Sequence, residues 1–367
     1  MTAVRRPDAR TVSPARRAVD RARELASDPR RVARRFRPRR VVATARAWQA
    51  TKQPPVPSVG PVLTPAQALR ENGFTIFRGL FRADECAALA ADLKRDAGIT
   101  AGVEFTRVDA TNKFARTRDV LFDPRVLAAV RSAVEEPVRF LQVSDLHYLH
   151  DTSGWHRDSV HREVDSSGAA DWDDDQYGVV KAILYMESDN AAMGIMAGSH
   201  LSPLEIDRDF VMAVEKRSGQ VVIDTHEEPN RRFSPAERRR PMAWKARVGD
   251  LLVFDERMYH AGRRVDAGRV TGEVQAAKFT LSLVFGPENM HSWRLYSYFR
   301  YARRELHYKP YPADFRAALA EHELLLADLG NYYLQHPEEL RLAHLRHPET
   351  MDDLVAEFTR LGAQQRR

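Results

Sequence analysis

Short strand-like segments fill the middle of the chain, from Val138 to about Phe285, and they constrain the possible folds more than any other feature. Turn residues separate them, and they do not alternate regularly with helices. The segments read "RFLQVSDLHYLH", "YGVVKAILYM", "GIMAGSH", "QVVIDTH", "GDLLVFD" and "KFTLSLVF". Several short strands in a row favour a β-sandwich or barrel over an α/β fold.

Helical signals lie on both sides of this β-rich region. Thr64 followed by Pro65 is typical of an N-cap with proline at the first helical position, and Gly73 is placed to end that helix. A strand-like "FTIFRGLF" follows, and Asp84 to Lys94 has helical periodicity. We expect helix again from Pro312 to the end of the chain.

The composition is that of an ordinary globular protein. Of the 367 residues, 43% are hydrophobic and 29% are charged. No run of about 18 apolar residues occurs, so we expect no transmembrane segment. The one cysteine, Cys86, cannot form an internal disulfide, and the chain does not begin with an apolar signal-peptide stretch. We therefore expect a cytoplasmic protein.

Positive charge is concentrated at the start of the chain. Residues 1–52 hold 16 lysines and arginines and four acids, a net charge of +12, so residues 53–367 carry −6 of the total of +6. This arm could make a peripheral contact with an anionic surface, or it could be a solvated leader. Because the body is acidic, we expect no specific nucleic-acid binding. The prolines of "QPPVPSVGP" predict a linker after it.

One of five His-x-Asp/Glu pairs stands out by its position. Only His156 and Asp158 directly follow a long strand-like run, to which a "DTSG" turn joins them. Alternate residues of a strand point to one face, so both side chains can reach one cation. A kinase catalytic loop would need asparagine where Glu163 stands, and no glycine-rich phosphate loop occurs, so we discard that function.

A third candidate ligand lies in "VGDLLVFDERMYHAGRRV". His260 comes just after an apolar strand-like run, at the start of a glycine-containing turn. Two histidines and one carboxylate form the facial triad of non-haem iron(II) oxygenases, which leaves coordination positions open. A closed structural zinc site would need a fourth protein ligand, and none is obvious. We predict that His156, Asp158 and His260 bind a metal.

These segments, in this order, resemble the phytanoyl-CoA dioxygenase-like family of iron(II)- and 2-oxoglutarate-dependent oxygenases. The matching stretches are "ENGFTIFRGLF", "GWHRDS", "VVKAILYMES", "MGIMAGSH" and "GDLLVFDERMYHAG". The resemblance runs from about Thr64 to Phe285. It implies a mainly β fold with flanking helices, built on a double-stranded β-helix of the jelly-roll or cupin-like kind. It also implies Fe(II), 2-oxoglutarate as cosubstrate, and O2.

The resemblance further implies a basic residue on a late strand that pairs with the distal carboxylate of 2-oxoglutarate. Lys278 falls where the family usually has arginine, and alternation puts Lys278, Thr280 and Ser282 on one face of its strand. Arg269 is a second candidate for this anchor. Lysine lacks the planar fork of arginine. The alternative is therefore a metal-dependent enzyme of the same fold that does not use 2-oxoglutarate.

Other side chains could line the pocket. Gln142 and Tyr185 are candidates for cosubstrate binding, and Ser144, Lys181 and Trp155 are candidates for the substrate pocket. Gln142 and Ser144 would share one face of the strand before the metal pair, and Lys181 and Tyr185 one face of the strand after it. Each of them could equally be a packed or surface residue of a β-sheet.

The expected reaction is hydroxylation of an unactivated C–H bond in a small-molecule or lipid-like substrate. Related halogenases replace the carboxylate ligand by a small residue, whereas Asp158 is present here. The other class of function is a non-catalytic binding protein tethered by its basic arm. We predict a flexible or partly helical leader over residues 1–55, the oxygenase domain over 56–300, and a C-terminal helical extension over 301–367 that packs on the core.

Overall fold

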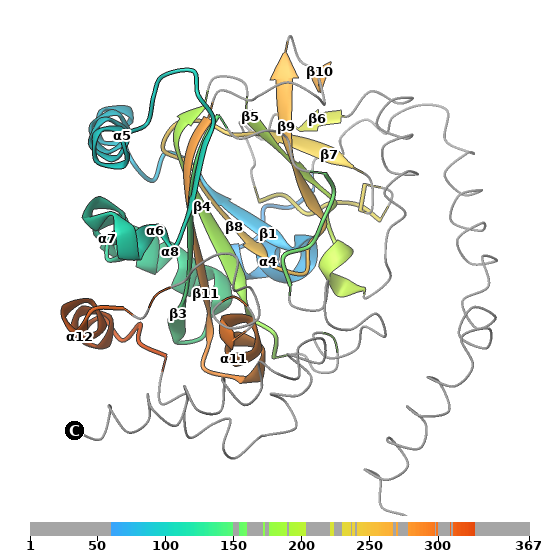
Figure 1. Ribbon diagram of the computed structural model, residues 1–367. Helices are drawn as coiled ribbons and strands as arrows, with labels where there is room; N and C mark the ends of the chain where they lie inside the picture. The colour runs from blue at the N-terminus through green and yellow to red at the C-terminus, as the bar shows by residue number, and fades with distance from the viewer. Residues whose placement is uncertain are drawn as a thin grey trace, which may run out of the picture. The chain divides into compact units, whose positions relative to one another are not determined.

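Figure 1 shows the computed structural model of the chain. It describes residues 60–149, 154–159, 172, 176–188, 191–202, 221–223, 230–235, 237–238, 241–266, 269–270, 278–297, 299, 309 and 311–326. For residues 191–192, 221–223, 264–266, 269–270, 290, 293–294 and 297 it describes the backbone alone. The predicted leader, its contact with an anionic surface, and residues 327–367 of the predicted extension lie outside the described residues.

Two β-sheets form the framework of the described region. One has six strands in the order β1-β8-β4-β11-β3-β2, and the other has five in the order β10-β9-β5-β7-β6. The strands of the first sheet are β1 (Phe74–Phe77), β2 (Phe105–Val108), β3 (Val138–Tyr148), β4 (Val180–Ser188), β8 (Leu251–Asp255) and β11 (Lys278–Pro287). Those of the second are β5 (Ala191–Ile195), β6 (Val221–Ile223), β7 (Met242–Lys245), β9 (His260–Asp266) and β10 (Arg269–Val270).

The chain passes from sheet to sheet as it advances. It runs from β4 to β5, from β7 to β8, from β8 to β9, and then through β10 to β11. The pairs are antiparallel except for β6 with β7. Two antiparallel sheets joined by such alternating connections make a double-stranded β-helix. The predicted fold class is confirmed.

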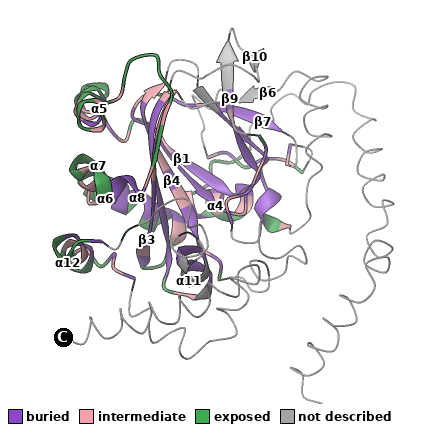
Figure 2. Ribbon diagram, viewed as in Figure 1, coloured by how far each residue is buried: buried purple, intermediate pink, exposed green. Residues whose placement is uncertain are grey.

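Helices cover the outer face of the six-stranded sheet. They are α5 (Ala83–Ala97), α6 (Ala110–Lys113), α7 (Ala115–Leu121), α8 (Pro124–Val134) and α12 (Ala313–Glu321), while α4 (Pro65–Asn72) precedes β1 and α11 (Met290–Ser297) follows β11. In Figure 1, α5, α7, α8 and α12 lie on one side of this sheet, and in Figure 2 their exposed faces point away from it. Their apolar residues form one core with the strands. Burying each large side chain there contributes roughly 1.5 to 3 kcal/mol.

The end signals read for α4 are confirmed in detail. The Thr64 hydroxyl accepts a hydrogen bond from the Gln67 N–H (3.2 Å), and the Gln67 side chain accepts one from the Thr64 N–H (3.0 Å). Gly73 ends the helix with φ 88°. A Cβ at Gly73 would lie 2.5 Å from Nδ1 of His200, so glycine is needed there for space as well as for backbone conformation.

The strand β11 separates two environments. Phe279, Leu281 and Leu283 face the helix-covered core. Alternation therefore turns Lys278 and Thr280 to the other face, toward the five-stranded sheet. A second apolar cluster fills the space between the sheets; it includes Ile76, Tyr185, Ile195, Trp244, Leu252 and Phe254. We call this space the barrel interior.

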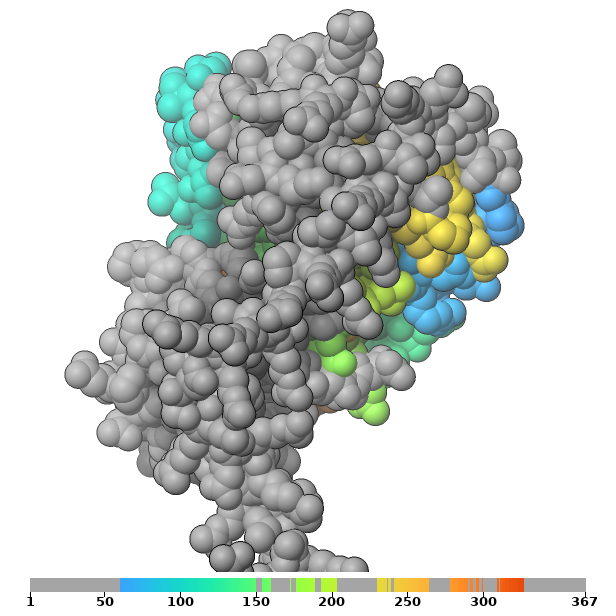
Figure 3. Space-filling model, turned by 90° about the vertical axis from the view of Figure 1, so that its right-hand side faces the viewer, coloured from blue at the N-terminus to red at the C-terminus, as the bar shows by residue number. Residues whose placement is uncertain are grey.

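The start of the described region is tied to residues far along the chain. The Leu63 N–H donates to the Asn230 carbonyl (2.9 Å), and the Arg232 N–H donates to the Pro61 carbonyl (3.0 Å). Figure 3 shows these two segments, blue and yellow, side by side on one face. None of the helices in the described part of the chain has the length and apolar character needed to cross a membrane.

Candidate metal centre

Backbone hydrogen bonds bring the predicted ligands together. The His156 N–H donates to the His260 carbonyl, and the His260 N–H donates to the His156 carbonyl, both at 3.0 Å. The Asp158 N–H donates to the Glu256 carbonyl, also at 3.0 Å. We expected His156 and Asp158 on a strand. The structure instead shows an isolated bridge at His156, and backbone bonds to the turn between β8 and β9 place Asp158.

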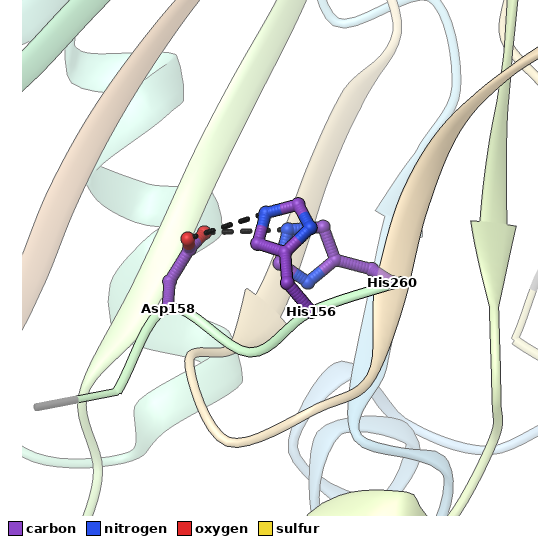
Figure 4. A group of neighbouring side chains, drawn as sticks. All are labelled: His156, Asp158 and His260. Carbon is purple, nitrogen blue, oxygen red and sulfur yellow. Dashed lines mark ion pairs between the residues drawn. The ribbon is translucent and has the colours of Figure 1, made fainter. Parts of the chain in front are cut away.

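The three side chains point toward one another (Figure 4). Oδ1 of Asp158 lies 3.5 Å from Nε2 of His156, and Oδ2 lies 3.3 Å from Nε2 of His260. The candidate ligand atoms all lie within 4.8 Å of one another. The imidazole centroids are 4.3 Å apart. Three protein donors on one side of a common point can therefore hold one cation.

The second nitrogen of each imidazole is engaged by a carbonyl. Nδ1 of His156 lies 2.7 Å from the Gly154 oxygen, and Nδ1 of His260 lies 3.1 Å from the Met258 oxygen. A carbonyl can only accept, so Nδ1 carries the proton and donates. Each Nε2 then presents a lone pair toward Asp158. Metal-binding histidines are usually oriented by such a hydrogen bond.

The protonation states also suit a metal. Burial lowers the pKa of His260, the neighbouring His156 lowers it further, and Asp158 offsets only part of this, so the imidazole is neutral at neutral pH. Burial acts to raise the pKa of Asp158, but Lys181 and His260 outweigh it and hold that pKa well below its usual range. The Nε2 atoms of two imidazoles and one carboxylate are a donor set that fits iron(II) and leaves coordination positions open.

Two further charged residues lie beside Asp158. The Lys181 ammonium lies 2.5 Å from Oδ2 of Asp158 and 3.7 Å from Oε1 of Glu256. Burial acts to lower the pKa of Lys181, but these two carboxyl groups outweigh it and raise the pKa. Burial raises the pKa of Glu256 to about 8, although Lys181 acts in the opposite direction. Lys181, a predicted pocket residue, thus lies against a candidate metal ligand.

Sequence reasoning did not find Glu256. It belongs to "DERMYH", in which three charged residues in a row suggest an exposed turn. The structure buries Glu256 completely. No periodic pattern in a turn of this length distinguishes the buried acid from its neighbours.

Three predicted cosubstrate residues gather in another part of the barrel interior. Thr280 pairs with Tyr185 across β11 and β4, and Lys278 pairs with Ser188 at the end of the same ladder. The ring of Tyr185 packs edge-on against Trp244, with centroids 5.5 Å apart. Lys278 is half-buried. Loss of solvation lowers its pKa to about 8, and Glu104 offsets only part of the shift.

Two predicted substrate-pocket residues, Ser144 and Trp155, do not face the metal group. Ser144 accepts a hydrogen bond from the Thr111 N–H (3.0 Å), so it faces the helices rather than the substrate pocket for which it was predicted. Trp155 packs with Met196, Tyr259 and Ala261. Trp155 is next to His156 in sequence, and Ala261 is next to His260. Successive residues of an extended segment point to opposite faces, so Trp155 lies on the face away from the imidazoles and does not line the metal site.

Two candidates for the cosubstrate site have less defined positions. Gln142 has φ 56° in the irregular part of β3, where the pairing with β11 shifts register. It is buried, at 7% exposure. Arg269 begins β10, and its side chain is outside the described residues.

Several solved structures are similar to this one at 15–18% sequence identity. SnoN, a non-haem α-ketoglutarate-dependent epimerase from nogalamycin biosynthesis, is 16% identical over 61% of this chain and 82% of its own, with a TM-score of 0.40. HygX from Streptomyces hygroscopicus, with nickel and 2-oxoglutarate bound, is 18% identical over 62% and 88% (0.41). EctD from S. alaskensis, with 2-oxoglutarate and 5-hydroxyectoine, is 15% identical over 65% and 86% (0.42).

The sequence itself carries the assignment to a family. No curated protein matches the chain. The family model for phytanoyl-CoA dioxygenase matches residues 69–269, which is more than half of the chain. That range includes His156, Asp158 and His260. The chain therefore belongs to the phytanoyl-CoA dioxygenase family of iron(II)- and 2-oxoglutarate-dependent oxygenases.

Proposed function

We propose that this chain is an iron(II)- and 2-oxoglutarate-dependent dioxygenase in which His156, Asp158 and His260 hold the metal. The observation that carries the proposal is the convergence of two Nε2 lone pairs and one carboxylate within 4.8 Å, with both Nδ1 atoms bound to carbonyls. Such a group leaves one side of the metal open for a cosubstrate and O2.

The chain's own residues bind and orient the reactants. His156, Asp158 and His260 would hold the iron, and Lys278 and Thr280 would bind the distal carboxylate of 2-oxoglutarate from one face of β11, with Tyr185 opposite Thr280. The iron, with the bound cosubstrate and O2, supplies the oxidising power for a substrate C–H bond. The apolar side chains between the sheets exclude water from this space.

Hydroxylation of a small-molecule or lipid-like substrate is the proposed outcome. The support is chemical: Asp158 provides a carboxylate ligand, whereas related halogenases have a small residue there and bind chloride. Whether desaturation, epimerisation or cyclisation occurs instead of hydroxylation depends on how the substrate is positioned. The chain's own residues orient that substrate, so product analysis with a candidate substrate decides among these reactions.

The test is a spectrum recorded without oxygen. Protein purified anaerobically and loaded with Fe(II) should gain a visible charge-transfer band when 2-oxoglutarate is added, because the cosubstrate chelates the iron. His260→Ala should lose the band. His322→Ala should keep it, because His322 stacks on Phe122 (centroids 4.5 Å apart), outside the metal group.

A second measurement separates the alternatives. Admitting O2 to the loaded protein should give succinate in step with oxygen consumption. A metal-dependent enzyme that does not use 2-oxoglutarate would bind the metal but show neither the band nor succinate. A binding protein tethered by its basic arm would keep its biological role after His156→Ala and lose it after deletion of residues 1–52. Either result would contradict the proposal.

A further inference from the structure

Asp158 is held twice, through its main chain and through its side chain. The Glu256 carbonyl accepts the N–H groups of Asp158 (3.0 Å) and Ser159 (3.1 Å). The Glu256 N–H donates to the Val179 carbonyl (3.2 Å), two residues before Lys181. The Lys181 ammonium in turn donates a hydrogen bond to the Asp158 carboxylate. The three residues therefore close a ring that fixes the carboxylate relative to β4.

The side chains of this ring are removed from solvent. Relative exposures are 12% for Lys181, 13% for Asp158 and 1% for Glu256. Burying an ammonium group costs several kcal/mol unless anionic partners compensate. The Asp158 carboxylate supplies such an anion at 2.5 Å from the Lys181 ammonium, and Oε1 of Glu256 lies 3.7 Å from the same nitrogen.

The contact of Lys181 distinguishes the two oxygens of Asp158. The ammonium donates to Oδ2, which also lies 3.3 Å from Nε2 of His260, whereas Oδ1 accepts no hydrogen bond from Lys181 and lies 3.5 Å from Nε2 of His156. A carboxylate whose second oxygen already accepts a short charge-assisted hydrogen bond is poorly placed to chelate a metal through both oxygens. Single-oxygen binding leaves one more coordination position open than chelation does.

We propose that Lys181 is a positioning residue that makes Asp158 bind the metal through one oxygen and so preserves the coordination positions that the cosubstrate needs. The inference rests on the proposed function, because it concerns the same metal group. It deepens that function by assigning a residue that touches neither the metal nor the cosubstrate. Glu256 supports Lys181 from the other side and through its main chain.

The experiment replaces iron by Co(II), whose visible absorption reports coordination number and geometry without turnover. Wild-type protein, Lys181→Met and Lys181→Arg are titrated with Co(II), and the loaded proteins are then titrated with 2-oxoglutarate. We expect Lys181→Met to bind Co(II) with an altered absorption spectrum before any cosubstrate is added. Its 2-oxoglutarate affinity should fall by about 10- to 100-fold, the size of effect that loss of an outer-shell partner has on metal affinity or activity. Lys181→Arg should restore the spectrum, because it still donates to the carboxylate.

Controls separate this effect from a loss of structure. Lys94→Met removes a lysine that pairs with Glu187 of the same strand, β4, at 2.6 Å, and it should leave the Co(II) spectrum unchanged. Melting temperatures of the metal-free proteins report folding. If Lys181→Met does not fold, Lys181→Ala, which also removes the donor and leaves room for water beside Asp158, is expected to change the spectrum in the same direction.

The outcomes are distinct. A Lys181→Met protein with the wild-type Co(II) spectrum and 2-oxoglutarate affinity would overturn the inference. A folded variant that binds no Co(II) would also overturn it, because the inference requires Asp158 to remain a ligand without Lys181. So would a variant that binds Co(II) more tightly with an unchanged spectrum, because Lys181 would then compete with the metal for Asp158. Failure of the wild-type protein to bind Co(II) would instead refute the proposed function itself.

Discussion

Two lysines face the barrel interior from the neighbouring strands β4 and β11, and the fold treats them differently. Lys181 pairs across the ladder with Val284, and Lys278 pairs with Ser188 at the other end. Lys181 has the carboxylate of Asp158 at 2.5 Å, and its pKa is raised. Among the residues that the structure describes, none forms an ion pair with Lys278, and burial lowers its pKa to about 8.

The difference separates an ammonium group that an ion pair within the fold compensates from one that has no ion pair among the described residues. A buried ammonium with nearby carboxylates is compensated by the folded chain alone. One that loses solvation without a close anion is less stable in its charged form. A dicarboxylate cosubstrate that binds the metal through one end could supply the missing anion to Lys278 through the other. Lys181 thus lies beside the metal group, and Lys278, at the other end of the ladder, has the position and charge that the proposed function assigns to the cosubstrate anchor.

The largest expected effect is on the free energy of unfolding. It tests whether Phe279 and Lys278 lie on opposite faces of β11, as this comparison requires. Phe279→Ala empties a fully buried position in the helix-covered core, next to Lys278 in sequence but on the opposite face. Loss of such a side chain should lower the free energy of unfolding by about 3 to 5 kcal/mol. Urea unfolding measures it. A loss of less than about 1 kcal/mol would contradict the burial of Phe279 in the helix-covered core.

Lys278→Met should come next in size. Removing one partner of a buried charged contact costs about 2 to 5 kcal/mol of binding free energy, which is a loss of about 30-fold or more in 2-oxoglutarate affinity. Calorimetry on the Co(II)-loaded protein measures it, with Lys278→Arg as the matched control. Co(II) affinity should not change, because Lys278 lies at the other end of the ladder. If Co(II) affinity falls as well, the two ends are not separate.

The pH dependence of cosubstrate binding gives the smallest effect. The pKa of Lys278 is lowered from 10.5 to about 8, so its ammonium is present below pH 8 and is lost as the pH rises above it. Because a carboxylate binds the charged form, 2-oxoglutarate affinity should be flat below pH 8. It should then fall by up to about tenfold per pH unit above it. Lys278→Arg should stay flat through this range. A wild-type affinity that is equally flat would remove Lys278 as the anchor.

The sequence allowed the strands, the metal group and the first helix to be predicted because each depends on local signals. The capping of α4 follows from Thr64, Pro65 and Gly73, three residues within ten positions. The two faces of β11 follow from strict alternation in "KFTLSLVF". The metal group follows from histidines that each lie at the edge of a strand-like run. The capping and the alternation need only the direct neighbours of each residue, whereas the metal group also needs His260 to lie beside His156, which the family resemblance implied.

Other placements depend on contacts that no local pattern encodes. Ser144 was assigned to the wrong side of β3 because that strand is buried on both faces, with Phe140 and Leu146 under the helices and Leu141 and Val143 buried on the opposite side. Without a polar face, alternation does not show which face meets the pocket. Lys181 likewise resembles a surface residue until Asp158, more than twenty positions earlier, is placed beside it.

The paired backbone hydrogen bonds between His156 and His260 have a consequence for biosynthesis. These two residues are 104 positions apart in sequence (156 to 260), so a chain that has emerged from the ribosome only as far as β7 has one imidazole and the carboxylate but no complete site. Bringing such distant segments together is a slow, late event in folding. The three side chains of the metal group can therefore come together only after His260 has been synthesised and has paired with His156.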